Sequence, residues 1–138
     1  MTSDDELKQF NQSLIAEFRA KHGQVDGWSS LLLLTTIGAK TGQPHTTPLT
    51  YSTDSDHIIL IGAYLGAPKH PAWYHNLLAN PAVIVELGSE RLRMHAVIAE
   101  GKERERLFNQ HAAQVPVSVE YQEKASRLLP VVILERVS

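Results

Sequence analysis

A glycine-bounded turn, Gly38 to His45 ("GAKTGQPH"), contains residue types that can bind an anion. Glycine permits positive φ angles, and successive N–H groups in such a turn can form a concavity that holds a negative charge. Lys40 supplies a compact positive charge and Thr41 supplies a hydroxyl donor, and both groups suit a phosphate. The same residue types are also typical of an ordinary hairpin turn with a solvated lysine. Both interpretations stay open on the residues alone.

A second stretch, "GAPKHPAWYHNLLANP" at 66–81, combines proline, aromatic rings, histidine and lysine around one short helix. Pro71 suits the first position of a helix, because its missing N–H has no intrahelical partner there. The helix should run for about two turns and stop before Pro81. Trp73 and Leu77 would then share one apolar face, which is typical of core packing. The stretch is therefore either a loop-to-helix junction or one wall of a ligand site.

Composition excludes several classes of protein. The chain has 138 residues, 43% of them hydrophobic, a net charge of −2 and no cysteine. These values indicate one globular domain without disulfides or thiolate metal sites. The slightly negative net charge argues against a nucleic-acid partner. No apolar run is long enough to span a bilayer, so we expect a cytoplasmic protein without an integral membrane segment. Peripheral contact with the membrane through an amphipathic N-terminal helix is left open. No metal site is expected, since His70 and His75 have the wrong spacing.

Hydrophobic periodicity predicts the elements that position these residues. An amphipathic helix should run from about Leu7 to Phe18 and stop near Gly23. Pro48 should place its strand at an edge or at a bulge. Few helices separate the strands, so the pattern favours a mainly β, α+β fold whose antiparallel sheet closes as a small barrel. Strands are predicted at 29–37, 45–52, 57–63, 82–87, 91–100 and 130–136, and further helices at about 102–114 and 118–128.

Three segments resemble one known family. "LLLLTTIGAKTGQPHTTPL", "IGAYLGAPKHPAWYHNLLANP" and "YQEKASRLLPVVILERV" are similar to the deazaflavin (F420)-dependent nitroreductases, small split β-barrel oxidoreductases of actinobacteria. The resemblance covers roughly residues 28–137. It implies a single-domain split β-barrel like that of FMN-binding proteins, with an N-terminal helix at 1–24 and an F420-binding domain at 25–138. The implied cofactor is coenzyme F420, an 8-hydroxy-5-deazaflavin.

The resemblance also implies roles for particular residues. The turn should bind the cofactor phosphate, two strand segments should flank the deazaflavin ring, and the short helix should cap it. Tyr121 is the candidate catalytic residue, because it matches a tyrosine on the substrate side of the family's site. The implied cofactor contacts are Lys40, Thr41, His45, Thr47, Pro48, Leu49, Thr50, Gly62, Ala63, Tyr64, Trp73 and Asn76.

This chain departs from the family pattern in ways that affect its expected chemistry. Ala39 and His45 stand where members often carry arginine, which predicts a weaker clamp for a phosphate and its polyglutamate tail. The family's site contains a cluster of tyrosines on the substrate side. Of this cluster, this chain clearly keeps Tyr121, and Val115 and Ser118 occupy neighbouring positions. The proton donor for the acceptor is therefore not identified, and nitro reduction is not expected to be the main activity.

The expected function is transfer of a hydride from reduced F420 to a planar uncharged acceptor: a quinone, an activated alkene or a nitroaromatic compound. One alternative is a carrier that binds F420 or FMN without turnover. Another is a scaffold domain whose Trp73 helix packs against a partner chain. A small-molecule acceptor is the expected partner, and the protein is expected to be a monomer or a homodimer.

Overall fold

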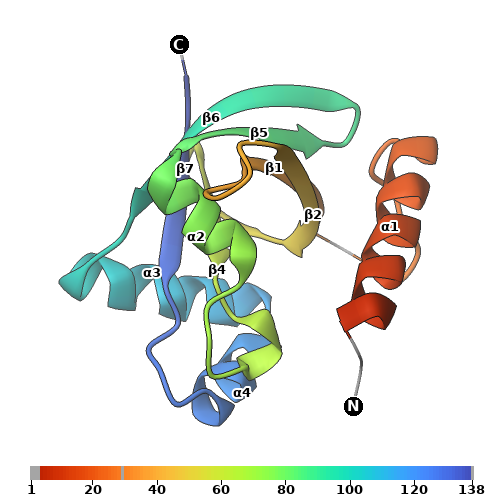
Figure 1. Ribbon diagram of the computed structural model, residues 1–138. Helices are drawn as coiled ribbons and strands as arrows, with labels where there is room; N and C mark the ends of the chain where they lie inside the picture. The colour runs from red at the N-terminus through yellow and green to blue at the C-terminus, as the bar shows by residue number, and fades with distance from the viewer. Residues whose placement is uncertain (1–3, 29, 138) are drawn as a thin grey trace.

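One antiparallel sheet of 7 strands dominates the computed structural model of the protein, which describes residues 4–28 and 30–137 (Figure 1). The strand order is β2-β1-β5-β6-β7-β4-β3. The strands are β1 (Leu31–Ile37), β2 (Pro44–Thr50), β3 (Ser52–Asp54), β4 (His57–Ile61), β5 (Ala82–Leu87), β6 (Glu90–Ile98) and β7 (Val131–Arg136). The helices are α1 (Asp4–Ala20), the 3₁₀ turn η1 (Tyr64–Gly66), α2 (Ala72–Ala79), α3 (Gly101–Gln114) and α4 (Val117–Lys124).

The two edge strands of the sheet, β2 and β3, follow one another directly in the chain. Thr50, the last residue of β2, pairs with Leu31, whereas Ser52, the first residue of β3, pairs with Ile59. Only Tyr51 separates them, so the sheet must curl until its first and last strands meet. The predicted barrel is confirmed, but the prediction of one continuous strand at 45–52 is wrong, because the chain changes its pairing partner at Tyr51.

Pro48 lies on β2, which is an edge strand and pairs with β1 alone among the described strands. Its partner in the register is Leu33. A missing N–H does least harm at an edge, where half of the backbone groups have no neighbouring strand. The predicted edge position is therefore confirmed.

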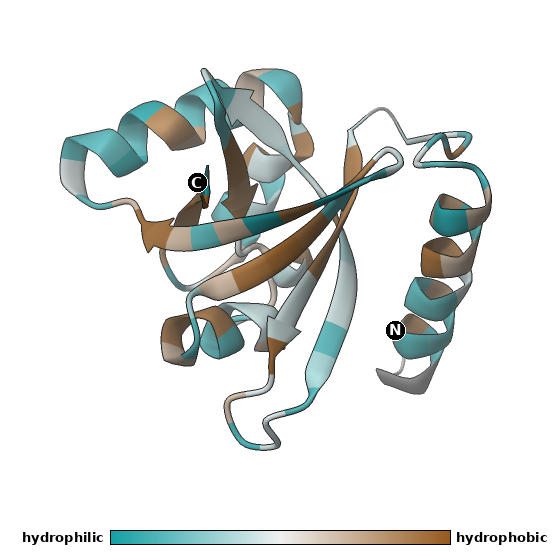
Figure 2. Cartoon of the chain, turned by 90° about the horizontal axis from the view of Figure 1, so that it is seen from above, coloured by the Kyte–Doolittle hydropathy of each residue, from teal (hydrophilic) through white to brown (hydrophobic). Residues whose placement is uncertain are grey.

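The barrel interior is filled by residues that alternate along β5 and β6. Val83 and Val85 are buried on β5, and Met94 and Ala96 are buried on the facing strand. Figure 2 shows hydrophobic residues along the strands and mixed faces on the helices. This alternation, together with the turn at Gly88–Ser89, confirms the predicted hairpin.

Helix α4 is shorter than the helix predicted at about 118–128. It ends at Lys124, and Ala125 already has an extended conformation with φ −71 and ψ 137. The amide of Gln122 donates a hydrogen bond of 2.8 Å to the carbonyl of Arg127, which folds the following segment back along the helix. This side-chain contact replaces the helical bonds that the sequence pattern had indicated.

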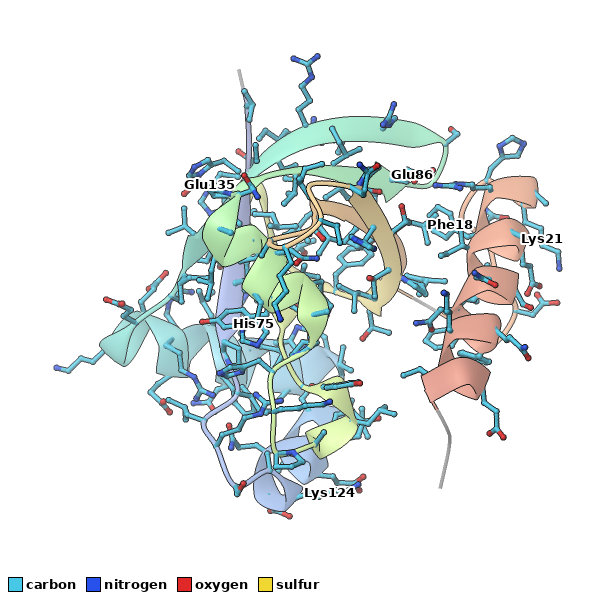
Figure 3. The ribbon with its side chains drawn as sticks, in the orientation of Figure 1. Phe18, Lys21, His75, Glu86, Lys124 and Glu135 are labelled. Carbon is cyan, nitrogen blue, oxygen red and sulfur yellow. The ribbon has the colours of Figure 1, made fainter. Side chains whose placement is uncertain are left out.

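Helix α1 packs against the barrel through its apolar face. Leu14 and Phe18 form a buried cluster with Val25, Leu31 and Leu33. In Figure 3 the side chain of Phe18 points from α1 toward the sheet, whereas Lys21 points away. No helix in residues 4–28 and 30–137 is both long and apolar enough to cross a membrane.

A two-pronged ion pair adds to this packing. The guanidinium of Arg19 donates hydrogen bonds of 3.0 and 2.9 Å to the two carboxylate oxygens of Glu86 on β5. The Arg19 side chain is 53% exposed, so the pair adds little to stability and mainly orients the helix.

We expect Phe18→Ala to lower the free energy of unfolding by about 3–5 kcal/mol, because it empties a buried aromatic position. Phe18 is 1% exposed, whereas Phe10 on the same helix is 54% exposed and provides the matched control. Phe10→Ala should change stability by less than about 0.5 kcal/mol. Chemical denaturation of the three proteins measures both effects. Equal losses in the two variants would show that α1 does not belong to the core.

Candidate functional site

A cleft of about 510 Å³ lies between α1, β2, the η1 turn, α2 and the α3–α4 junction. Its walls bring together residues that are far apart in the sequence. Of the residues predicted for the site, it contains Thr47, Pro48, Leu49, Thr50, Ala63, Tyr64, Trp73 and Tyr121. The other predicted residues, which are Lys40, Thr41, His45, Gly62 and Asn76, do not line it.

The β2 wall offers unpaired backbone groups. Because β2 has a strand neighbour on one side only, some backbone C=O and N–H groups of Thr47 to Thr50 are free of the ladder, although Pro48 has no N–H to offer. Such groups suit the polar edge of a flat heterocycle. Helix α1 closes the cleft beside this wall with Leu7, Phe10, Asn11 and Leu14. The lining is thus mostly apolar, with a few free backbone groups at one side.

Helix α2 provides the second wall through Trp73. The indole is 5% exposed, belongs to the main core cluster and also lines the cleft. Pro71 was predicted to be the first helical residue, but the helix begins one residue later, and Pro71 is its N-cap with a φ of −69. Core packing and ligand contact were alternatives for Trp73 in the sequence, and the position of the ring is compatible with both.

Asn76, one turn further along α2, uses its amide within the protein. Its Oδ1 accepts a 3.0 Å hydrogen bond from the N–H of Ala39, and its Nδ2 donates a 3.2 Å bond to Oγ1 of Thr36. Thr36 is fully buried. Asn76 therefore connects α2 to the turn between β1 and β2, and it affects the cleft only through the position of that turn.

The turn itself is a tight hairpin connection. Gly38 donates to the carbonyl of Gln43 and accepts from the N–H of Gly42. A Cβ at Gly38 would lie 2.5 Å from Oγ1 of Thr41, so a side chain there would require Thr41 to move. Oγ1 of Thr41 accepts from the N–H of Gln43 and lies 3.3 Å from Nε2 of His45. The hydroxyl of Thr41 is thus partly used in shaping the turn.

Lys40 differs from its neighbours in the turn. Its side chain is exposed and has no hydrogen-bond or ion-pair partner in the described part of the chain. Its charge is therefore available to an anion, as the sequence predicted for a phosphate site.

The segment after β4 begins with a glycine that is required by packing. Gly62 donates a 2.9 Å hydrogen bond to the carbonyl of Pro130, and a Cβ there would lie 2.6 Å from Cγ of Pro130. Tyr64 and Leu65 follow with positive φ angles of 46° and 56°. Each such residue costs roughly 1–3 kcal/mol, so surrounding contacts must hold the segment in place.

Arg127 makes those contacts. Its guanidinium donates hydrogen bonds of 3.1 Å to the carbonyls of Ala67 and Ala63, and it lies 3.0 Å from Nδ1 of His70. Burial and the neighbouring Arg127 charge together lower the pKa of His70, so this imidazole is neutral and accepts the bond. The strained turn that presents Tyr64 to the cleft is thereby fixed from behind.

The α3–α4 junction forms the last wall, and it contains a residue that the sequence reasoning missed. Val115, Ser118 and Tyr121 line the cleft, and so does His111. The ring of His111 is buried, and its Nδ1 shares a 2.7 Å hydrogen bond with the hydroxyl of Ser52. Burial lowers the pKa of His111 to about 4, so the imidazole is neutral near pH 7.

A signal for His111 was present in the pattern of α3. Arg104, Leu107, Phe108 and His111 are its buried residues, with the spacing of one helical face. The periodicity thus places His111 on the buried face. Its partner Ser52 was not predictable from spacing, because the two residues are far apart in the chain.

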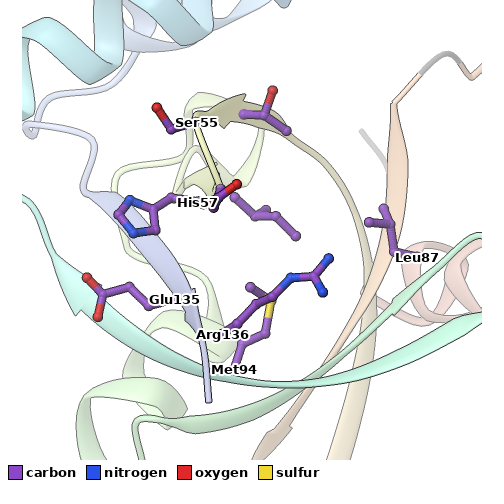
Figure 4. Close-up of a pocket in the computed structure, with 9 residues that line it drawn as sticks. Ser55, His57, Leu87, Met94, Glu135 and Arg136 are labelled. Atoms are coloured by element: carbon purple, nitrogen blue, oxygen red, sulfur yellow. The ribbon is translucent and has the colours of Figure 1, made fainter. Parts of the chain in front are cut away.

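A second cavity of about 760 Å³ lies near the β3–β4 turn (Figure 4). It is lined by polar groups such as Ser55, His57, Glu135 and Arg136. It shares no lining residue with the cleft, and none of the predicted site residues lies in it.

The curled sheet with a cleft along its open strand defines a split β-barrel. The same fold is found in an FAD-binding protein from Mesorhizobium loti, at 14% sequence identity and a TM-score of 0.57, with 91% of this chain and 88% of that chain covered. Residues 9–136 match the F420H(2)-dependent quinone reductase family, and the chain belongs to that family.

Individual relatives agree with this assignment. An F420H(2)-dependent quinone reductase of Mycobacterium tuberculosis is 36% identical over 130 residues, which is 88% of this chain and 86% of the relative. The solved structure of an F420-H2 dependent reductase is 39% identical, with a TM-score of 0.70, and covers 76% of this chain and 93% of that one. A domain-swapped dimer is 34% identical, with a TM-score of 0.73, and covers 96% and 100%. The protein is thus an oxidoreductase that uses coenzyme F420, which confirms the predicted class and cofactor.

We expect Asn76→Ala to lower the free energy of unfolding by about 1–3 kcal/mol, because it leaves the buried Thr36 hydroxyl without its donor. The N–H of Ala39 should also exchange with solvent faster, since its acceptor is lost. Hydrogen exchange followed by NMR measures this directly. Asn80→Ala, at the exposed end of the same helix, is the control and should leave the Ala39 signal unchanged. Unaltered protection of Ala39 in Asn76→Ala would contradict the role of the amide in holding the turn.

Proposed function

We propose that the protein transfers a hydride from reduced F420 to a planar, uncharged acceptor, and that a quinone is the preferred class. Activated alkenes and nitroaromatic compounds are the slower alternatives. The observation that carries this proposal is the apolar cleft, in which Tyr64, Trp73 and Tyr121 meet beside the free edge of β2. Among the described residues the lining contains no Lys, Arg, Asp or Glu, so it favours a neutral flat molecule over a carboxylate or a phosphate ester.

The cofactor ring would lie against Thr47–Thr50 on one side and Ala63–Tyr64 on the other, with Trp73 covering it. The free backbone groups of β2 support this arrangement, because they can hydrogen-bond to the polar edge of a deazaflavin. When bound, reduced F420 supplies the hydride. The protein supplies orientation, anion contacts and a pocket that excludes water.

The phosphate end of the cofactor would reach the turn between β1 and β2. Strand β2 spans about 20 Å from Pro44 to Thr50, so a ligand that extends along it connects the cleft with the turn. Lys40 would attract the phosphate, with Thr41 and His45 beside it. Because Ala39 adds no charge, the clamp depends on Lys40 more than the family pattern implies.

Tyr121 would act on the acceptor side. Its side chain is half-buried and lines the cleft, so its hydroxyl can meet an oxygen of a bound acceptor. Val115 and Ser118 lie near it and leave room that a bulkier side chain would fill. The hydroxyl would stabilise the negative charge that develops on a quinone or enone oxygen.

A carrier of F420 or FMN without turnover is the second candidate. Lys40 is the single fixed cation in the described turn between β1 and β2, which favours weak binding of the phosphate. The lining residues proposed from the sequence also include no evident proton donor for the acceptor, which favours binding without turnover. The division into a helix at 1–24 and a cofactor-binding barrel at 25–138, the cytoplasmic location, and a monomeric or homodimeric state are retained as parts of the proposal.

One experiment separates the candidates. The protein is titrated with F420 and with FMN while Trp fluorescence is followed, and reduced F420 is then mixed with menadione. Tight F420 binding with menadione-dependent oxidation supports the reductase. Binding without oxidation supports the carrier, and binding of neither cofactor contradicts both.

We expect Lys40→Ala to weaken F420 binding by about tenfold, because one charge-assisted contact to the phosphate is lost. The loss should shrink as salt is added. Lys102→Ala on exposed α3 removes the same charge elsewhere and should leave the dissociation constant unchanged. An unaltered constant for Lys40→Ala at low salt would show that this lysine is only a solvated turn residue.

We further expect faster oxidation of reduced F420 by menadione or a cyclic enone than by a bicyclic nitroimidazole. The nitro acceptor is expected to depend most on the family's tyrosine cluster, of which this chain keeps Tyr121 and has Val115 and Ser118 at neighbouring positions. Tyr121→Phe should slow quinone turnover, since it removes a donor to the acceptor oxygen. Stopped-flow traces at equal acceptor concentration provide the rates. A nitroimidazole rate equal to or above the quinone rate would overturn the assignment of acceptor class.

A further inference from the structure

His111 and Ser52 form a buried polar pair that the proposed function does not yet use. His111 is on the buried face of α3 and is 2% exposed, and Ser52 is the first residue after the bend at Tyr51. Their contact, 2.7 Å between Oγ and Nδ1, joins the helix to the strand that closes the barrel. One atom of the pair, Nε2 of His111, is left for another partner.

The direction of this hydrogen bond follows from the surroundings of Ser52. If Nδ1 donated the proton, the hydroxyl hydrogen of Ser52 would have no acceptor among the described residues. A buried donor without an acceptor is destabilising, because it has lost its hydrogen bonds to water. Ser52 therefore donates and Nδ1 accepts, which leaves the single proton of the neutral imidazole on Nε2.

That Nε2–H group belongs to the one residue of the pair that lines the cleft. Within the described chain it has no hydrogen-bond partner. Among the described residues, Arg104 Nε is the one fully enclosed side-chain polar atom without a partner, so Nε2 of His111 is not fully enclosed. The Nε2 atom is therefore accessible, and His111 is a lining residue of the cleft. The lining from α3 and α4 includes the apolar Val115 and Val117 beside the hydroxyl-bearing Ser118 and Tyr121, and it contains no charged side chain among the described residues.

We propose that His111 donates a hydrogen bond from Nε2 to a carbonyl oxygen of the planar ligand in the cleft, and that Ser52 positions the ring for this contact. The inference rests on the proposed function and deepens it, since it adds a group to the same site. A neutral N–H suits an oxygen on which negative charge develops, because the donor is fixed in place and is not hydrated.

The proton balance is simple. The acceptor would gain a hydride and a proton and be reduced, and the reduced cofactor would lose a hydride and a proton and be oxidised, with water carrying the proton from one to the other. The imidazole of His111 keeps its proton throughout, so it acts as a hydrogen-bond donor and not as a general acid. Both a quinone and the deazaflavin carry carbonyl oxygens, and the test distinguishes these two sources.

A pair of amide substitutions isolates the donor. The amide of His111→Gln reaches the position of Nε2, whereas that of His111→Asn reaches only the position of Nδ1 and stays with Ser52. We expect His111→Asn to lose about tenfold in acceptor kcat/KM or in F420 affinity, and His111→Gln to recover most of that loss. The two variants carry the same functional group, so a merely structural role would not separate them in this way.

The two measurements identify the ligand oxygen. A lower menadione kcat/KM with an unchanged dissociation constant for oxidised F420 assigns the contact to the acceptor. A higher dissociation constant for F420 assigns it to the deazaflavin. Equal behaviour of His111→Asn and wild type in both measurements overturns the proposal.

A readout without turnover separates this inference from the proposed function. ¹⁵N NMR of the imidazole in the ligand-free protein should show the proton on Nε2, and Ser52→Ala should lose this preference. Addition of oxidised F420 or of menadione should shift the Nε2–H signal. A proton on Nδ1 in the wild type, or no shift with either ligand, overturns the proposal even if the histidine variants do not fold. Failure of menadione to oxidise reduced F420 would instead contradict the proposed function alone.

Discussion

The bend at Tyr51 is the constraint on which the rest of the structure depends. One short segment, 44–54, must serve as the first and the last strand of the sheet, because Thr50 pairs with β1 and Ser52 pairs with β4. Its first half stays at an open edge and forms a wall of the cleft. Its second half is held by α3, where Arg106 donates to the carboxylate of Asp54 and so lowers the pKa of that side chain. The position of the cleft wall is therefore set by barrel closure and not by a mobile loop.

The buried polar groups connect the walls of the cleft. Asn76 bridges α2 to Thr36 and to the β1–β2 turn, and His111 bridges α3 to Ser52 on the closing strand. The side chains of Asn76 and His111 are both buried, and an unsatisfied polar atom is costly at such positions. Slipping either helix along the barrel would break such a bond without offering water in exchange. These few bonds thus fix the register of the helices more strongly than apolar contacts alone.

Much of this fold was predictable from the sequence, because local patterns decide local structure. Alternating residues gave the β5–β6 hairpin, helical spacing gave α1 and α3, and Pro48 marked an edge strand. The break at Tyr51 was not predictable, since Thr, Tyr and Ser continue a strand pattern and only pairing with two distant strands forces the bend. The early end of α4 at Lys124 likewise depends on a side-chain contact to Arg127. The resemblance indicated many of the cleft residues, but the buried pair of Ser52 and His111 follows from tertiary contacts alone.

The segment before β7 affects the cleft without lining it, because it holds the strained turn at Tyr64 in place. Two residues with positive φ would relax if they were free to do so. Arg127 prevents this by holding the carbonyls of Ala63 and Ala67, and Pro130 packs against Gly62, where no side chain would fit. The end of β4, the turn and the chain entering β7 therefore form one rigid unit. This unit presents Ala63 and Tyr64 to the cleft, so the C-terminal part of the barrel determines the width of the cleft on this side. The flat ligand must therefore fit a wall that is already in place.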